Sequence, residues 1–170
     1  MFDFAGRFPR RIHSSWRSVD TAALVMRVVL GICFILHGGQ KLFGLFGGPG
    51  IGGTAGFFAT AGIPVPEASA YVAAILEFFG GIALLVGFLT VALSAALIID
   101  MILAIATVTF SAGFFGGWEL NFYLIALLAA LLLTGPGAWS ADSALGLTRR
   151  RSPAPAAVPS QQEGQAEARA

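Results

Sequence analysis

From residue 78 onward the chain contains three long stretches without Asp, Glu, Lys or Arg, at residues 78–99, 101–118 and 120–141. A bilayer core of about 30 Å is crossed by about 20 helical residues, so each run is close to the length of one membrane-spanning helix. Hydrophobic residues make up 56% of the chain and charged residues only 11%. A soluble domain of this size could not hide so much apolar surface. These features exclude a soluble enzyme, a nucleic-acid-binding protein and a disordered chain.

The sequence predicts an all-α, polytopic membrane protein with four transmembrane helices in an antiparallel bundle. The predicted spans are residues 21–46, 68–88, 89–111 and 120–134. All four are expected to be helical, because lipid offers no partner to an unpaired backbone N–H or C=O group. A transmembrane β-barrel is disfavoured, since no segment of about ten residues alternates between polar and apolar side chains.

Arginine residues are concentrated outside the two ends of the predicted bundle. Four precede the first span and a run of three, Arg149–Arg151, closely follows the fourth, whereas the connections at 47–67 and 112–119 contain no Lys or Arg. The positive-inside rule therefore predicts that both termini are cytoplasmic. The chain then divides into a basic arm at 1–20, a membrane domain at 21–145 and a tail at 146–170. The tail is rich in Pro, Ala, Gln and Glu, and we expect it to be disordered.

The Gly-rich connection at 47–67 is too apolar for an ordinary exposed loop and too rich in glycine for a span. We expect a loop or a short helix that lies on the outer membrane face and caps the bundle. Phe57 and Phe58 are interpreted as interfacial anchors, since aromatic side chains favour that region. A flexible apolar linker is the alternative.

Several ionisable residues fall within or at the edge of the predicted spans, where a charge is costly and therefore a candidate for function. A rise of 1.5 Å per residue places Glu77 and Asp100 each roughly 15 Å deep, near the midplane. His37 and Lys41 lie one turn apart in the outer half of the first span. Arg27 is near the cytoplasmic face and is interpreted as an interfacial anchor whose head group reaches water.

Helical spacing predicts which of these groups face each other. In each span the polar residue shares a face with small residues, which allow helices to approach closely and so indicate the inside of a bundle. In the third and fourth spans, the predicted inward faces comprise Ala92, Ala96, Asp100, Ala104, Thr107 and Ser111, and Glu119, Tyr123, Ala126 and Ala130. The polar residues are expected to converge in one intramembrane network that comprises His37, Lys41, Glu77, Asp100 and Glu119. This network is interpreted either as buried ion pairs that fix helix register or as a pocket for a proton-coupled or head-group-binding step.

Several metal and cofactor chemistries lack their residues in this sequence. A bis-His haem site needs two histidines, and besides His37 the chain has only His13, on the N-terminal arm. A di-iron site in a bundle needs two Glu-x-x-His pairs, which are absent. The single Cys33 excludes an intramolecular disulfide. No metal site is expected, no catalytic residue is assigned, and independent catalytic activity is not expected.

Four segments form a set of motifs along about Ala22–Leu145. They are Arg27-x3-Gly31-x2-Phe34-x2-His37-Gly38-x2-Lys41-Leu42-Phe43-Gly44, Ala61-Gly62-Ile63-Pro64, Glu77-x2-Gly80-Gly81-x2-Leu84-x2-Gly87-x2-Thr90, and Gly135-Pro136-Gly137-Ala138-Trp139-Ser140-Ala141-Asp142. Together they resemble the DoxX family of small four-span bacterial membrane proteins. The resemblance implies a multi-pass protein of the bacterial cell membrane.

The DoxX family is named after subunits of an archaeal thiosulfate:quinone oxidoreductase or terminal quinol oxidase. Some actinobacterial members are linked to membrane oxidoreductase complexes that act against oxidative stress. The resemblance therefore implies a membrane component of a quinone-linked or oxidative-stress system. Such a component would contribute a quinone pocket and contacts with redox partner proteins rather than a redox centre. A scaffold or assembly factor without chemistry and a small proton-coupled transporter are the alternatives.

Overall fold

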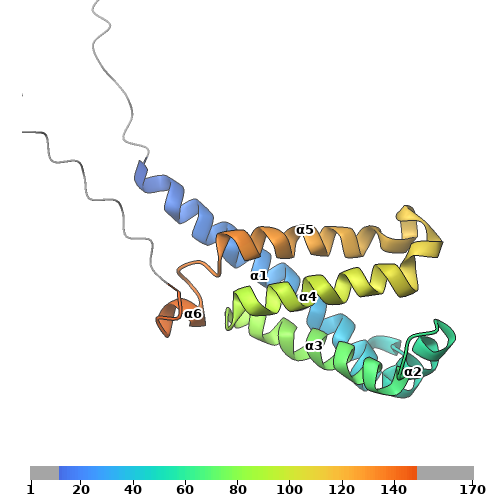
Figure 1. The fold of residues 1–170 in the computed structure, drawn as a ribbon. Coiled ribbons are helices and arrows are strands. Elements are labelled where there is room, and N and C mark those ends of the chain that lie inside the picture. Colours follow the sequence, from blue (N-terminus) through green and yellow to red (C-terminus); the bar gives the residue numbers. More distant parts are fainter. Residues whose placement is uncertain (1–11, 149–170) are drawn as a thin grey trace, which may run out of the picture.

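The computed structural model describes residues 12–148, and within them every regular element is helical (Figure 1). Four stretches are long and apolar enough to cross a membrane, namely Ser18–Phe43, Pro66–Val86, Thr90–Ala112 and Phe114–Thr134. The predicted all-α bundle of four transmembrane helices is therefore confirmed. The helices are α1 (Ile12–Phe43), α3 (Pro66–Val86), α4 (Thr90–Ala104) and α5 (Glu119–Thr134), with the short α2 (Gly50–Thr60) and α6 (Ala141–Ala144).

Two helix starts differ most from the predicted spans. Helix α1 begins at Ile12, inside the predicted N-terminal arm, because residues 12–20 contain no Gly or Pro that would stop a helix. The fourth span begins at Phe114 because the short segment η4 (Phe114–Trp118), whose backbone is kinked at Phe115 and Gly116, leads directly into α5. Residues 1–11 of the predicted arm, and the predicted tail from residue 149 onward, lie outside the described residues.

Helices α1 and α3 form the most extensive contact of the bundle, and glycines make it possible. A Cβ atom on Gly81 would lie 2.8 Å from the backbone nitrogen of Ile35 and 2.9 Å from the carbonyl oxygen of Gly31. Only a residue without a side chain fits at such a distance, as in other closely packed transmembrane helices. This contact aligns the second half of α1 with α3 and fixes the distance between their polar residues.

The connection at 47–67 contains helix α2, which packs on α3 and α1. Figure 1 shows α2 at the opposite end of the bundle from α6 and the start of α1. Its buried residue is Thr54, whose hydroxyl donates to the carbonyl oxygens of Gly50 at 2.8 Å and Lys41 at 3.4 Å. The connection is thus the expected short helix, and it covers the end of the bundle where Lys41 lies.

The other end of the bundle is closed by the segment that follows α5. Asp142 is buried there, and its carboxylate accepts hydrogen bonds from the backbone nitrogens of Leu89, at 2.8 Å, and Thr90, at 2.9 Å. These amides begin α4, whose own N-terminus has no side-chain cap. The carboxylate of Asp20 similarly accepts from the nitrogen of Ala138 at 2.8 Å. The closing segment therefore joins the starts of α1 and α4.

Arg27 lies in the same region and is only 1% exposed. Its guanidinium donates to the carbonyl oxygen of Trp139, 112 residues further along the chain. Any side chain at Gly87 would collide with this guanidinium. The interpretation of Arg27 as an interfacial anchor was wrong, because the guanidinium turns inward to the closing segment rather than outward to water.

The buried residues of α4 and α5, in the apolar core between these two ends, differ from the inward faces predicted for the third and fourth spans. The buried residues of α4 are Thr90, Ser94, Leu97 and Met101. Those of α5 are Leu124, Leu128 and Leu131, whereas Tyr123 is 51% exposed. Small residues indicated the inward face correctly where helices touch closely, as in α3, but α5 fills its wider interface with leucines.

Candidate functional site

A cavity of about 980 Å³ lies at the α2 end of the bundle and is lined by residues from α1 to α5. This volume is at the upper end of the range of about 300–1,000 Å³ that is typical of small-molecule sites. Its walls are largely apolar and include the side chains of Phe34, Phe57, Phe58, Leu103 and Leu120. The polar residues that line it are His37, Lys41, Thr54, Ser69, Glu77, Asp100, Thr107, Thr109 and Asn121.

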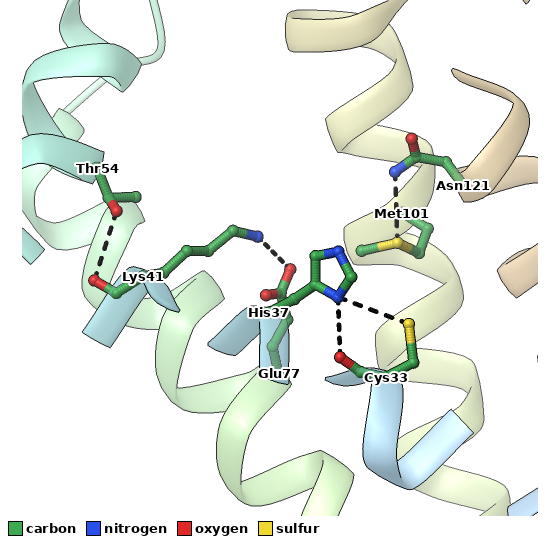
Figure 2. A network of polar contacts seen from close by, with 7 residues as sticks. All are labelled: Cys33, His37, Lys41, Thr54, Glu77, Met101 and Asn121. Atoms are coloured by element: carbon green, nitrogen blue, oxygen red, sulfur yellow. Dashed lines mark hydrogen bonds and ion pairs between the residues drawn. The ribbon is translucent and has the colours of Figure 1, made fainter. Parts of the chain in front are cut away.

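Lys41 and Glu77 form an ion pair across the α1–α3 contact, as Figure 2 shows. The two partners differ in exposure, since the side chain of Lys41 is 28% exposed and that of Glu77 only 2%. The ammonium binds Oε1, while the buried Oε2 of Glu77 has no hydrogen-bond donor among residues 12–148. A buried charge is stable only when it is paired, and here one carboxylate oxygen remains available to a proton or a ligand.

Asp100 brings a second carboxylate to this place from α4. It interacts electrostatically with both Glu77 and Lys41. Among the described residues no donor reaches its buried Oδ2 atom, but the carboxyl groups of Asp100 and Glu77 are close enough to hydrogen-bond each other when one of them carries a proton. An unsatisfied buried polar atom costs about 1–3 kcal/mol. Nearly all buried polar atoms in native structures therefore have a hydrogen-bond partner, and each exception needs an explanation, such as a role in function. The carboxyl groups of Asp100 and Glu77 can therefore share one proton, which makes this pair a candidate for proton exchange.

The imidazole of His37 is oriented by its own helix. Its Nδ1 atom lies 2.8 Å from the carbonyl oxygen of Cys33 and 3.6 Å from the Cys33 sulfur (Figure 2). Because a carbonyl oxygen can only accept, Nδ1 carries the hydrogen of this bond. The other nitrogen, Nε2, is then an acceptor in the neutral ring and a donor in the charged ring. His37 lines the cavity, so Nε2 is the ring atom that a ligand can use.

The structure brings four of the five predicted site residues together, since His37, Lys41, Glu77 and Asp100 all line the cavity. Glu119 lies apart from them. It is partly exposed in the first turn of α5, where Oε2 accepts from the nitrogen of Gly116 at 3.3 Å. Its position follows from the leucine face of α5, which turns Glu119 away from the cavity.

Thr109 and Asn121 line the same cavity but were not predicted from the sequence, because only charged or titratable residues were assigned to the polar network. An uncharged polar residue inside an apolar helix was the available indication. Among the described residues, no group of three or more His, Cys, Asp or Glu side chains is placed to hold a metal ion.

Comparison with known proteins identifies the family. The DoxX family model matches residues 22–110, which include the four charged or titratable residues of the cavity. The "Putative oxidoreductase CatD" of Bacillus subtilis (strain 168) is 34% identical over 119 residues, which cover 70% of this chain and 83% of that protein. No solved structure shows a significant match. The chain therefore belongs to the DoxX family and is a multi-pass membrane protein.

Proposed function

We propose that this protein is a quinone-binding component of a quinone-linked or oxidative-stress oxidoreductase system in the bacterial cell membrane. The observation that supports this most is the combination of a largely apolar cavity of about 980 Å³ with His37 and Lys41 on its wall. A quinone ring has apolar faces and oxygens that accept hydrogen bonds, so it needs both kinds of surface. The name of the Bacillus relative, an oxidoreductase, supports the redox class.

The residues of the cavity fit a quinone oxygen. The imidazole of His37 and the ammonium of Lys41 lie one turn apart on α1 and line the cavity together. Either group can donate a hydrogen bond to a carbonyl oxygen. No donor in the described part of the chain reaches the buried oxygens Oε2 of Glu77 and Oδ2 of Asp100, and each is a place where a proton can be held beside that oxygen, either alone or shared between the two carboxyl groups.

A bound quinone would supply the redox chemistry, because its reduction to the quinol takes up two electrons and two protons. The part of this chain is to bind the head group, to exclude bulk water with apolar walls and to hold protons. The atoms assigned to the protons are Nε2 of His37, Oε2 of Glu77 and Oδ2 of Asp100. The electrons would come from a redox partner protein, which the proposal places at the membrane beside this chain.

A titration of the purified protein with short-chain ubiquinone and menaquinone analogues tests the proposal. His37→Phe should raise the Kd about tenfold, the effect of losing one hydrogen bond of about 1.4 kcal/mol. Leu36→Ala is the control, because Leu36 neighbours His37 on α1 but is 41% exposed and outside the cavity. A wild-type protein that binds neither analogue, or a His37→Phe variant that binds as the wild type does, would contradict the proposal.

The two alternative functions have distinct outcomes. A scaffold or assembly factor would bind no quinone but would co-purify with a partner protein whose abundance falls when this chain is deleted. A proton-coupled transporter would give reconstituted vesicles a pH-dependent flux that Glu77→Gln abolishes.

A further inference from the structure

The wall of the cavity formed by α4 and α5 carries polar atoms that the ion-pair cluster does not use. Asn121, in the first turns of α5, donates from Nδ2 to the sulfur of Met101 at 3.4 Å (Figure 2). A thioether sulfur is a weak acceptor. The amide N–H of Asn121 is therefore easily diverted to a stronger acceptor, such as a carbonyl oxygen in the cavity.

Thr109 is a second polar residue on this wall. Its hydroxyl oxygen is buried without a hydrogen-bond partner, although the residue lines the cavity. The hydroxyl of Thr107, two residues earlier, is occupied by the carbonyl oxygen of Leu103 at 2.8 Å. Thr109 thus differs from its neighbour in having a buried hydroxyl that no described residue engages.

The backbone that presents Thr109 is irregular. After α4 the helix widens into the π-helical turn η2 (Ile105–Thr109). Such turns are rare and are frequently found at functional sites. The turn lies where α4 forms the cavity wall, since Thr107, Val108 and Thr109 all line it.

The cavity therefore has polar atoms on two walls that come from different helices. His37 and Lys41 belong to α1, whereas Thr109 and Asn121 belong to the α4–α5 hairpin. In Figure 2, Asn121 and Lys41 lie on opposite sides of His37. The apolar side chains of Phe34, Met101 and Leu124 also line the cavity.

We propose that Asn121 and Thr109 form a second oxygen-binding subsite, so that the cavity takes a ring with oxygens on two opposite edges. One oxygen accepts from His37 or Lys41, and the other accepts from Nδ2 of Asn121 and the hydroxyl of Thr109. This inference rests on the proposed function and specifies its substrate class as a para-quinone, which has its two carbonyl groups in that arrangement.

Comparing the Kd values of two ligands distinguishes the loss of this subsite from a general disturbance of the cavity by the substitution. One is a 1,4-naphthoquinone with a short alkyl chain, and the other is the matching bicyclic ketone with a single carbonyl. Asn121→Leu should raise the Kd of the quinone about tenfold, as expected for one lost hydrogen bond, and leave that of the ketone unchanged. Tyr123→Phe is the control, since it removes a hydroxyl from the same helix at a residue that is 51% exposed and outside the cavity.

Thr109 provides a second test that does not depend on the folding of the Asn121 variant. Thr109→Val keeps the shape of the side chain and should also weaken quinone binding selectively, whereas Thr109→Ser keeps the hydroxyl and should bind as the wild type does. Unchanged quinone binding in both Asn121→Leu and Thr109→Val, or equal weakening of both ligands, would overturn the subsite. If His37→Phe still weakens the quinone in that case, the proposed function stands without it. A wild-type protein that binds no quinone would overturn both.

Discussion

Glu77 is the most deeply buried charge of the cavity, with 2% of its side chain exposed, and the ammonium of Lys41 is its ion-pair partner. Asp100 adds a second carboxylate that interacts with both of them. Removal of the ammonium would leave two carboxylates facing each other in an apolar environment. Breaking a buried ion pair by removing one partner typically costs about 3–5 kcal/mol.

This pairing predicts the outcome of a double-mutant cycle measured by thermal unfolding in detergent. Lys41→Met alone should destabilise the protein by about 3–5 kcal/mol, but much less when it is combined with Glu77→Gln, which has no charge left to pair. Glu119→Gln is the matched control, because that acid lies outside the cavity, and its effect should add to that of Lys41→Met. Additive effects of Lys41→Met and Glu77→Gln would show that the pair contributes no coupling.

For single residues, the sequence was sufficient to predict the charged and titratable residues of the cavity, but not its uncharged polar residues or the contact of Arg27. The sequence predicted the positions of His37, Lys41, Glu77 and Asp100. A charged side chain inside an apolar span is costly in lipid, so it almost always faces the interior of the bundle. The partner of Arg27 could not be predicted, because it is a backbone carbonyl 112 residues away and no local pattern encodes that contact.

At the scale of single helices, α4 depends on a cap that comes from elsewhere in the chain. Leu89, the residue before α4, has a left-handed backbone with φ 49° and supplies no side-chain cap. Asp142 supplies it instead, by accepting from the nitrogens of Leu89 and Thr90. The motif that contains Asp142 is visible in the sequence. The role of Asp142 as a cap could not be predicted, because it depends on how the segment after α5 packs against the end of the bundle.

The loss of this cap is expected to lower the melting temperature in detergent. Asp142→Ala leaves two buried or half-buried amides without acceptors and should destabilise the protein by about 1–3 kcal/mol. Asp142→Asn retains one acceptor and should cost less. Asp20→Asn is a comparison, since the hydrogen bond that Asp20 accepts from Ala138 is exposed. Equal stability of Asp142→Ala and the wild type would contradict the assignment of Asp142 as the cap of α4.

At the scale of the whole molecule, the two ends of the bundle have different chemistry. The α2 end contains the cavity with its ion pair, whereas the other end is closed by Arg27, Asp142 and the segment after α5. A core of buried residues that includes Leu30, Leu84, Leu97 and Leu128 lies in the bundle between them. The positive-inside rule predicts that the closed end is cytoplasmic, which would place the cavity toward the outer face of the membrane.

Four spans could be predicted from the sequence, because hydropathy and helix length are local properties. The cavity could not, because it depends on how α2 covers the bundle and on a leucine-filled α5 interface that small residues did not indicate. Quinone binding in this cavity is therefore best measured on the intact protein.

That measurement is the quinone content, determined by mass spectrometry, of the protein extracted from its native membrane under mild conditions. We expect the wild type and Leu36→Ala to carry an isoprenoid quinone in stoichiometric amount, and His37→Ala to have lost it while it keeps its fold and its bound phospholipid. A wild-type protein that retains phospholipid but is consistently free of quinone would contradict the account.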